Sequence, residues 1–338
     1  MTRTFFDRPD DSSGMDTKPL GTTGESVSEL SLGAMYFGSR IDRETSFALL
    51  DRYYEAGGRF IDTANIYATW VDGYDEPESE PLVGEWLEER GVREEMTIAT
   101  KLGFSYGDVP RSLDPALIDE EIAKSRERLG IETIDLLYIH VDDPDTPQVD
   151  VMETLAGAVE AGDVRHLGAS NVPAWRIARA NRIAAEQGWP RFEAVQTRFS
   201  YMIPDRDADF AGQLPASDEL LDYCDQEDLT VLPYSPTMQG CYDRDDRPIP
   251  DGYVRSENRL KMDVVETIAE RKGVDGNAVV LAWMLDRDLP TIPVVGVSTM
   301  EQLEANLQAS EISFTDEERE RLNAIESLGF EEWDLRGE

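Results

Sequence analysis

The stretch TIDLLYIHVDDPDTPQVDVMETLAGAVEAGDVRHLGAS, residues 133–170, contains one complete strand–helix–strand unit. An apolar run over 133–140 ends at a histidine, a helical pattern follows at 151–161, and a second apolar run covers 164–170. Two strands joined in this way run parallel, because a parallel pair needs a crossover of a dozen or more residues. The unit therefore predicts a parallel β-sheet with helices packed against it.

Eight apolar runs of this kind follow one another along the chain, and their C-terminal ends are mostly about 27 to 40 residues apart, the length of a strand plus a crossover helix. They are Glu29–Ala34, Arg59–Asp62, Thr97–Lys101, Thr133–His140, Val164–Ser170, Phe192–Thr197, Thr230–Tyr234 and Thr291–Val295. Eight strands that alternate with helices predict a single closed (β/α)8 TIM barrel. A doubly wound sheet is disfavoured, because no G-x-G-x-x-G follows an early strand.

The intervening helices carry clear end signals. Asp114, Pro115 and Gly130 bracket one helix as an N-cap, a proline at the first position and a glycine C-cap. Another helix is expected to begin at Met262. The domain prediction is a barrel over residues 17–326, with a mobile acidic tail at 1–16 and an acidic tail at 327–338.

Long loops and an added helix complete the predicted architecture. Residues 203–217 and 237–259 are expected to form long loops on the active face of the barrel. The segment Phe314–Ile325, with Thr315 as its cap, is expected to form an extra helix after the last strand.

The charge is extreme: 70 acidic residues against 32 basic ones give a formal net charge of −38. Such a surface repels nucleic-acid phosphates and anionic lipids, so neither is expected as a partner. Lysine occurs only five times, at Lys18, Lys101, Lys124, Lys261 and Lys272. Few lysines among many carboxylates resemble the proteins of salt-loving organisms, in which salt screens carboxylate repulsion. The alternative is an acidic mesophilic protein.

Other composition features narrow the class further. The two cysteines and two histidines have no spacing that suits zinc, so no metal site is expected. The N-terminus lacks the apolar region of a signal peptide, and no run of 18 apolar residues occurs. We therefore expect a cytoplasmic protein.

Chemically active side chains occur where the predicted strands end. Asp62, Lys101 and His140 close three of them, and Tyr67 follows Asp62 by five residues. In a barrel, the C-terminal strand ends meet around one mouth. A carboxylate would hold the ammonium, and the ammonium would lower the pKa of the tyrosine and make it a better proton donor. The histidine could orient a carbonyl oxygen. A Schiff-base aldolase with Lys101 as nucleophile is the alternative.

The segments FIDTANIYA (60–68), IATKLG (98–103) and DLLYIH (135–140) resemble the signature segments of the aldo-keto reductase superfamily, and the resemblance extends from about residue 18 to 325. It implies a catalytic tetrad of Asp62, Tyr67, Lys101 and His140. The acidity suggests a haloarchaeal-type member. A non-catalytic, redox-sensing subunit of the same fold is a further alternative, which the intact tetrad disfavours.

The same resemblance implies a nicotinamide cofactor. Ser170 and Asn171 in HLGASNVPAW, together with Gln196, would hold the carboxamide. In LPYSPTMQG, Tyr234 would stack on the nicotinamide, and the loop that follows would approach the pyrophosphate. The loop residues are Ser235, Pro236 and Gly240.

The segment IPVVGVSTMEQLEANL (292–307) resembles the part of the family that binds the adenosine phosphate at a helix N-terminus. The implied contacts are Gly296, Ser298, Thr299, Gln302 and Asn306. Gly296 and Gln302 stand where many NADPH-specific members carry Lys and Arg, so the usual cations for a 2′-phosphate are absent from this segment. The family favours NADP(H) slightly, and NAD(H) stays open.

The resulting prediction is an NAD(P)H-dependent carbonyl reductase with Tyr67 as general acid, acting as a monomer on a small carbonyl or alcohol substrate. Trp70 lies just after Tyr67 and is a candidate substrate contact, whereas His166 is expected to be structural. The residues do not identify the substrate, because pocket specificity in barrels of this kind lies in the long loops.

Overall fold

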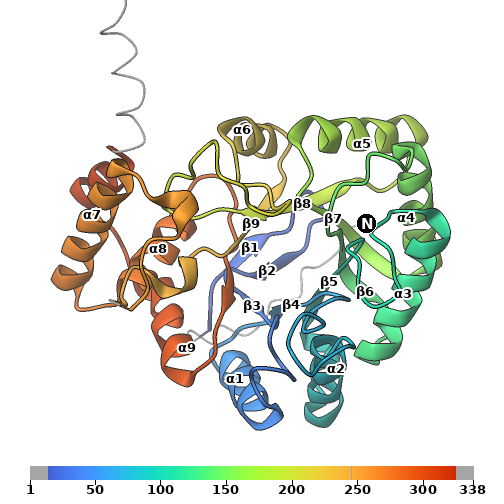
Figure 1. Cartoon of the computed structure of the whole chain (residues 1–338), viewed down its shortest axis with the longest axis horizontal. Helices are drawn as coiled ribbons and strands as arrows, with labels where there is room; N and C mark the ends of the chain where they lie inside the picture. Colours follow the sequence, from blue (N-terminus) through green and yellow to red (C-terminus); the bar gives the residue numbers. More distant parts are fainter. Residues whose placement is uncertain (1–13, 245, 325–338) are drawn as a thin grey trace, which may run out of the picture.

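The computed structural model describes residues 14–244 and 246–324, and its centre is a closed barrel of eight parallel strands (Figure 1). The barrel order is β10-β3-β4-β5-β6-β7-β8-β9, and β10 closes the ring by pairing with β3. The strands are β3 (Ser31–Gly33), β4 (Phe60–Asp62), β5 (Thr97–Leu102), β6 (Ile134–Ile139), β7 (Val164–Ser170), β8 (Phe192–Arg198), β9 (Thr230–Tyr234) and β10 (Val294–Gly296). The predicted TIM barrel is confirmed.

Helices surround the strands (Figure 1). They are α1 (Arg43–Glu55), α2 (Ser79–Arg90), α3 (Pro115–Leu129), α4 (Gln148–Ala161), α5 (Ala174–Gln187), α6 (Asp218–Gln226), α7 (Ser256–Lys272), α8 (Gly276–Leu285) and α9 (Met300–Leu307). The predicted ends of α3 are confirmed: Asp114 accepts a hydrogen bond from Ala116 N, and Gly130 adopts a left-handed φ of 64°. Glycine readily adopts this left-handed conformation, because it has no β-carbon to clash.

The start of α7 differs from the prediction. The helix begins at Ser256, six residues before Met262, so the end of the predicted 237–259 loop is helical. Its first turn is polar, and hydrophobic periodicity therefore does not reveal it. Asn258, which is fully buried, fixes this turn by accepting a hydrogen bond from Ile203 N and donating one to Tyr253 O, both at 2.8 Å.

Alternation along the strands decides what faces the inside of the barrel. Phe60, Ala99 and Tyr138 belong to a buried apolar cluster in the barrel, whereas their neighbours Ile61 and Ile98 belong to the core outside it. Side chains two residues apart on a strand share a face. Asp62, Lys101 and His140 therefore project inward, one step above this apolar layer.

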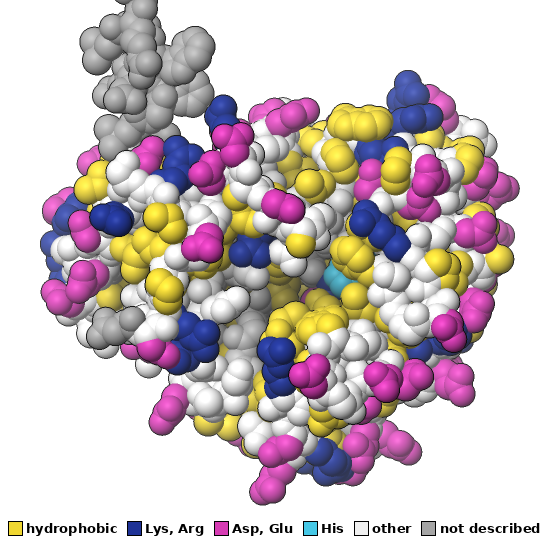
Figure 2. Space-filling model, viewed as in Figure 1, with side chains coloured by type: hydrophobic (Ala, Val, Ile, Leu, Met, Phe, Trp, Pro, Cys, Tyr) yellow, Lys and Arg dark blue, Asp and Glu magenta, His cyan; other side chains and the backbone are white. Residues whose placement is uncertain are grey.

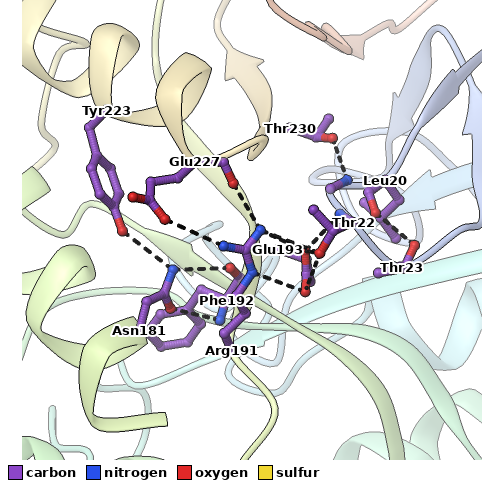
Figure 3. Close-up of polar contacts among 11 residues, drawn as sticks. Leu20, Thr22, Thr23, Asn181, Arg191, Phe192, Glu193, Tyr223, Glu227 and Thr230 are labelled. Carbon is purple, nitrogen blue, oxygen red and sulfur yellow. Dashed lines mark hydrogen bonds and ion pairs between the residues drawn. The ribbon is translucent and has the colours of Figure 1, made fainter. Parts of the chain in front are cut away.

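A hairpin that the sequence patterns did not predict lies at the other end of the barrel. Its strands are β1 (Thr17–Pro19) and β2 (Ser26–Ser28), and its Leu20 and Val27 belong to the inner apolar cluster. The hairpin turn is bonded to the starts of two barrel strands: Thr22 N donates to Glu193 Oε2 at 2.8 Å, and Gly21 N donates to Thr230 Oγ1 at 2.7 Å (Figure 3). The barrel is thus closed at one end and open at the end where Asp62, Lys101 and His140 lie.

The chain ends are described only in part. Met15 N donates to Ala56 O at 3.2 Å, and Asp16 O accepts from Glu29 N at 2.9 Å. Residues 316–324 are helical, within the predicted extra helix, whereas residues 1–13 and the predicted tail at 327–338 lie outside the described residues. No helix among the described residues has both the length and the apolar character that a membrane crossing requires.

Candidate active site

Lys101 is the centre of a buried hydrogen-bond group at the mouth of the barrel. Its ammonium donates to Asp62 Oδ1 at 2.5 Å, to the Thr63 carbonyl at 2.7 Å and to the Tyr67 hydroxyl at 2.9 Å. The Lys101 and Asp62 side chains are 0% and 1% exposed. Three acceptors use all three N–H bonds of an ammonium. The structure therefore brings Asp62, Tyr67 and Lys101 together as the sequence predicts.

The pKa of Tyr67 differs from the expectation. Burial raises it well above the ordinary value, and the negative charge of Asp62 adds to the effect. The sequence predicts that the ammonium of Lys101 lowers this pKa, whereas the pKa here is raised, because burial disfavours the charged phenolate. Tyr67 is therefore a neutral phenol. Its oxygen accepts from Lys101, which leaves its own hydrogen free for another acceptor.

His140 completes the group from the end of β6. Its ring centroid lies 6.0 Å from that of Tyr67 and 4.8 Å from that of Phe104, both edge-to-face. Burial, followed by the positive charge of Lys101, lowers the pKa of His140 well below its usual value, so the imidazole is neutral. Its Nδ1 is buried and has no partner among the described residues. A polar atom of this kind is suited to a ligand, because leaving it unpaired is costly.

The predicted carboxamide residues lie beside the tetrad and are linked to it. Gln196 Nε2 donates to the second oxygen of Asp62 at 2.7 Å. Asn171 Nδ2 donates to the His140 carbonyl at 3.0 Å and to Ser170 Oγ at 3.1 Å, and Asn171 Oδ1 accepts from the Tyr234 hydroxyl at 2.8 Å. The prediction did not include these links, which cross from one strand to another.

The residues predicted for the adenosine end lie apart from the tetrad, around a second pocket. A cavity of about 200 Å³ is lined by Gly240, Gly296, Gln302 and Asn306, which are four of the predicted contacts. Ser235, Pro236, Ser298 and Thr299 are not in its lining. Thr299 caps α9 by accepting from Gln302 N at 3.3 Å, and Gln302 Oε1 accepts from Ser298 N at 2.7 Å. Thr299 and Gln302 thus form a variant of the capping box at the start of α9.

Three residues that lie at the mouth of the barrel or in the second pocket were not predicted from the sequence. Phe104 contacts His140 and directly follows the Lys101 segment. Arg198 lies two residues after Gln196 on the same strand, and this spacing was an available signal for a side chain at the mouth. Arg244 lines the pocket beside Gly240 and Gly296 but belongs to a loop without periodicity. Its position could not be inferred from the pattern.

Trp70, the predicted substrate contact, packs against two tyrosines at the mouth of the barrel. Its ring is edge-to-face with Tyr67 at 5.9 Å and with Tyr36 at 6.4 Å, and the residue is 44% exposed. Phe104 contacts His140 instead, and we refer to the three rings of Tyr36, Trp70 and Phe104 as the aromatic wall. Figure 2 shows the face hollowed at its centre, with hydrophobic side chains and a histidine on the wall of the hollow.

Two other expectations concern residues away from this mouth. His166 lies in the first half of β7, with Nε2 3.3 Å from Glu25 Oε2, a position that suits a structural residue. No group of three or more His, Cys, Asp or Glu side chains within the described part of the chain is arranged to hold a metal ion.

A further cavity, of about 450 Å³, lies between the two long loops. Arg198 lines it together with aspartates and aromatic residues of both loops. The guanidinium of Arg198 donates to the Tyr253 hydroxyl at 3.0 Å and to Gln213 Oε1 at 2.7 Å. Arg198 thereby ties the 203–217 segment and the 251–253 turn to the mouth of the barrel.

The comparisons with known proteins agree on one family. Residues 29–327 match the Aldo/keto reductase family. The chain is 35% identical to the norsolorinic acid reductase stcV of Emericella nidulans, over 87% of this chain and 77% of that protein. It is 30% identical to the aryl-alcohol dehydrogenase [NADP(+)] of Phanerodontia chrysosporium, over 89% of this chain and 83% of that protein.

A solved structure agrees. The thermostable aldo-keto reductase Tm1743, crystallised with the inhibitor epalrestat, superposes with a TM-score of 0.73 at 25% identity, covering 92% of this chain and all of that one. With a matched region that spans most of the sequence, a barrel of the same architecture and reductase-named relatives, the chain belongs to the aldo/keto reductase family.

Proposed function

We propose that this protein is an NAD(P)H-dependent carbonyl reductase that converts an aldehyde or ketone into an alcohol, with Tyr67 as the general acid. The observation that carries the proposal is the buried chain of hydrogen bonds in which Lys101 joins Asp62 to the Tyr67 hydroxyl. A neutral phenol beside a fixed ammonium can give up a proton and then be stabilised as phenolate.

The residues present fit a nicotinamide dinucleotide. Asn171 and Gln196 lie beside the tetrad and carry amide groups, which can pair with a carboxamide in exchange for the hydrogen bonds they now make within the protein. At the other end of the proposed site, the cavity beside Gly240 is lined by Asn277, whose buried Oδ1 has no hydrogen-bond partner among the described residues. A bound reduced nicotinamide supplies the hydride that reaches the carbonyl carbon.

The chain's own residues carry out the rest of the reaction. As the carbonyl oxygen gains charge, the Tyr67 hydroxyl gives it a proton, and the resulting phenolate accepts the Lys101 hydrogen bond. Asp62 holds the ammonium in place, and Gln196 holds the second oxygen of Asp62. His140, neutral because of its burial, orients the carbonyl oxygen. The product alcohol thus receives its oxygen-bound proton from Tyr67, which is later reprotonated from solvent.

The aldolase alternative is weaker. Burial lowers the pKa of Lys101, and the charge of Asp62 opposes this effect. A nucleophilic lysine needs a free lone pair, whereas all three N–H groups of the Lys101 ammonium are donated to acceptors. Treating the protein with a carbonyl compound and borohydride separates the two functions, since only the aldolase forms a covalent adduct at Lys101.

An aryl aldehyde or aryl ketone is the proposed substrate class. The aromatic wall beside Tyr67 offers ring faces and edges to a planar group, and such pairs stabilise beyond their buried area. The name of one relative, an aryl-alcohol dehydrogenase, is consistent with this class.

We also propose that the cofactor is NADP(H), that the chain acts as a monomer and that it is adapted to high salt.

The test is a fluorescence titration with NADPH and NADH in molar KCl, followed by steady-state reduction of benzaldehyde and of an aliphatic aldehyde. We expect nucleotide binding and a higher kcat/KM for benzaldehyde. Trp70→Ala should lower the benzaldehyde value several-fold more than the aliphatic value. Trp175→Ala is the matched control, because this 58% exposed tryptophan contacts Arg176 and no ring of the aromatic wall. Absence of binding to both nucleotides would refute the proposed function.

A further inference from the structure

The pocket beside Gly240 and Gly296, called here the adenosine-end pocket, has one basic residue in its lining, Arg244. All of its lining residues belong to the described part of the chain. The pocket is formed by the loop after β9, the start of α8, and the segment that includes β10 and α9. Gly296 and Gln302 contribute no positive charge to it. Any cation that meets a phosphate inside this pocket must therefore come from the loop after β9.

The position of Arg244 depends on Gly240. The backbone N–H groups of Asp243 and Arg244 both donate to the Gly240 carbonyl at 3.2 Å, which makes a tight turn. Gly240 has a φ of +87°, and a β-carbon there would lie 3.3 Å from Arg244 Cδ and 3.7 Å from Asn277 Nδ2. The bare glycine thus gives the Arg244 stem room to lie across the turn toward the pocket, a close approach that any side chain would crowd.

The guanidinium of Arg244 is held by a partner that a phosphate can replace. It is paired with Asp246, with distances of 2.9 Å from Nε to Oδ1 and 2.7 Å from Nη2 to Oδ2. The Arg244 and Asp246 side chains are 40% and 67% exposed. Exposed pairs of this kind contribute little stability. A phosphate could take both hydrogen bonds in the same fork geometry that the carboxylate uses now.

One carboxylate of the lining, Asp243, is committed to the protein backbone and is not available to a ribose hydroxyl. Asp243 accepts from Gly276 N and from Asn277 N, the latter at 2.8 Å, so both of its oxygens cap α8. A carboxylate that selects NAD(H) accepts from the ribose 2′-hydroxyl. Asp275 and Glu301 also line the pocket, but both are exposed, and salt screens their repulsion of a phosphate.

We propose that Arg244 binds the 2′-phosphate of NADP(H) and sets the preference of this protein for NADP(H) over NAD(H). This assignment rests on the proposed reductase function. Many family members carry this cation in the segment after the last strand, whereas here the loop after β9 supplies it. Asp246 holds the guanidinium in place until the phosphate displaces it.

The test compares Arg244→Gln with the wild type by titration with NADPH and with NADH in the same KCl buffer. Loss of a charged, bidentate contact at this partly exposed position should raise the Kd for NADPH by about 10-fold. The Kd for NADH should change by less than about two-fold, because NADH lacks the phosphate that the contact requires. Asp246→Asn should lower the Kd for NADPH, since it frees the guanidinium.

Arg247→Gln is the matched control. It removes the same charge from the same loop, at an exposed residue that is not in the pocket lining, and should leave the NADPH-to-NADH ratio unchanged. A ratio that does not move in Arg244→Gln, or that moves equally in Arg247→Gln, overturns the assignment alone. A wild-type protein that binds neither nucleotide overturns the proposed function and the assignment together. Circular dichroism of each variant shows whether the fold is kept.

Discussion

Lys101 and Asp62 form an ion pair of 2.5 Å at a depth where neither side chain has more than 1% exposure. Taking two charges out of water is costly, and the cost is offset only when the remaining donors and acceptors are satisfied. Here the other Asp62 oxygen accepts from Gln196, and the other ammonium hydrogens go to Thr63 O and Tyr67. The hydrogen bonds of this ion pair are therefore satisfied by neighbouring residues of the proposed active site, among them Tyr67.

Removing one member of this pair should destabilise the protein strongly. Lys101→Met leaves the Asp62 carboxylate buried without its counter-ion, and we expect the free energy of unfolding to fall by about 3–5 kcal/mol. The double variant Asp62→Leu/Lys101→Met should be more stable than the single one, because no charge is left buried. Denaturant titration in constant KCl measures both.

The exposed pair Arg52–Glu304 serves as the control for that experiment. Its side chains are 33% and 44% exposed, so Arg52→Met should cost no more than about 1 kcal/mol. Equal losses for Lys101→Met and Arg52→Met would show that burial does not govern the energetics of the Lys101 pair.

Tyr67→Phe should remove the proton donor and keep the ring. We expect kcat for benzaldehyde reduction to fall by about 10²- to 10⁴-fold. The Kd for the nucleotide should stay nearly unchanged, because Asn171 and Gln196, which are proposed to bind the carboxamide, belong to other strands. Steady-state kinetics and fluorescence titration provide the two readouts. Tyr36→Phe changes another tyrosine of the mouth, which makes no hydrogen bond to Lys101, and should retain turnover. Full activity in Tyr67→Phe would rule out the proposed acid.

His140 should make folding stability depend on pH. Burial lowers its pKa in the folded protein, whereas the unfolded chain titrates near 6.5. Below about pH 6.5 the unfolded state therefore binds a proton that the folded state does not, and stability falls as the pH falls. The loss should reach about 1.4 kcal/mol per pH unit, and it should be absent above that pH.

His140→Gln isolates this contribution, since it removes the titrating group. Unfolding curves at several pH values between 5 and 8 should show a shallower decline for the variant than for the wild type. Parallel curves for the two proteins across that range would contradict a depressed pKa at His140.

Two helix glycines should respond oppositely to the same substitution. A β-carbon on Gly84, in α2, would lie 2.6 Å from the Leu129 carbonyl of the adjacent helix α3, so Gly84→Ala should destabilise by about 1–3 kcal/mol. Gly157, in α4, has nothing within 4 Å of the corresponding point, and Gly157→Ala should stabilise by about 0.5–1 kcal/mol. Thermal unfolding of both variants checks the pair of signs.

Salt should be needed for folding. With a net charge of −38, lowering the ionic strength lengthens the range of carboxylate repulsion from about 3 Å at 1 M to about 30 Å at 0.01 M. We expect circular dichroism to show loss of the folded state on dialysis from molar KCl into dilute buffer. A protein that keeps its spectrum and its unfolding midpoint in dilute buffer would favour the acidic mesophilic alternative.

The sequence by itself determined the barrel and the strand ends. A spacing of one strand plus one crossover helix, repeated around the chain, leaves parallel strands whose C-terminal ends share one rim. Since side chains alternate along a strand, Asp62, Lys101 and His140 had to face inward once Phe60, Ala99 and Tyr138 filled the layer below. Local patterns carried this information because it depends on neighbours in the chain.

Only the tertiary structure decided the contacts between distant segments. The bond from Gln196 to Asp62 joins residues 134 positions apart, and the raised pKa of Tyr67 follows from burial that several strands and loops create together. The hydrophobic pattern of the sequence likewise does not reveal the hairpin that closes the barrel, nor the position of Arg244 at the pocket beside Gly296. These features depend on packing in space, which local periodicity does not record.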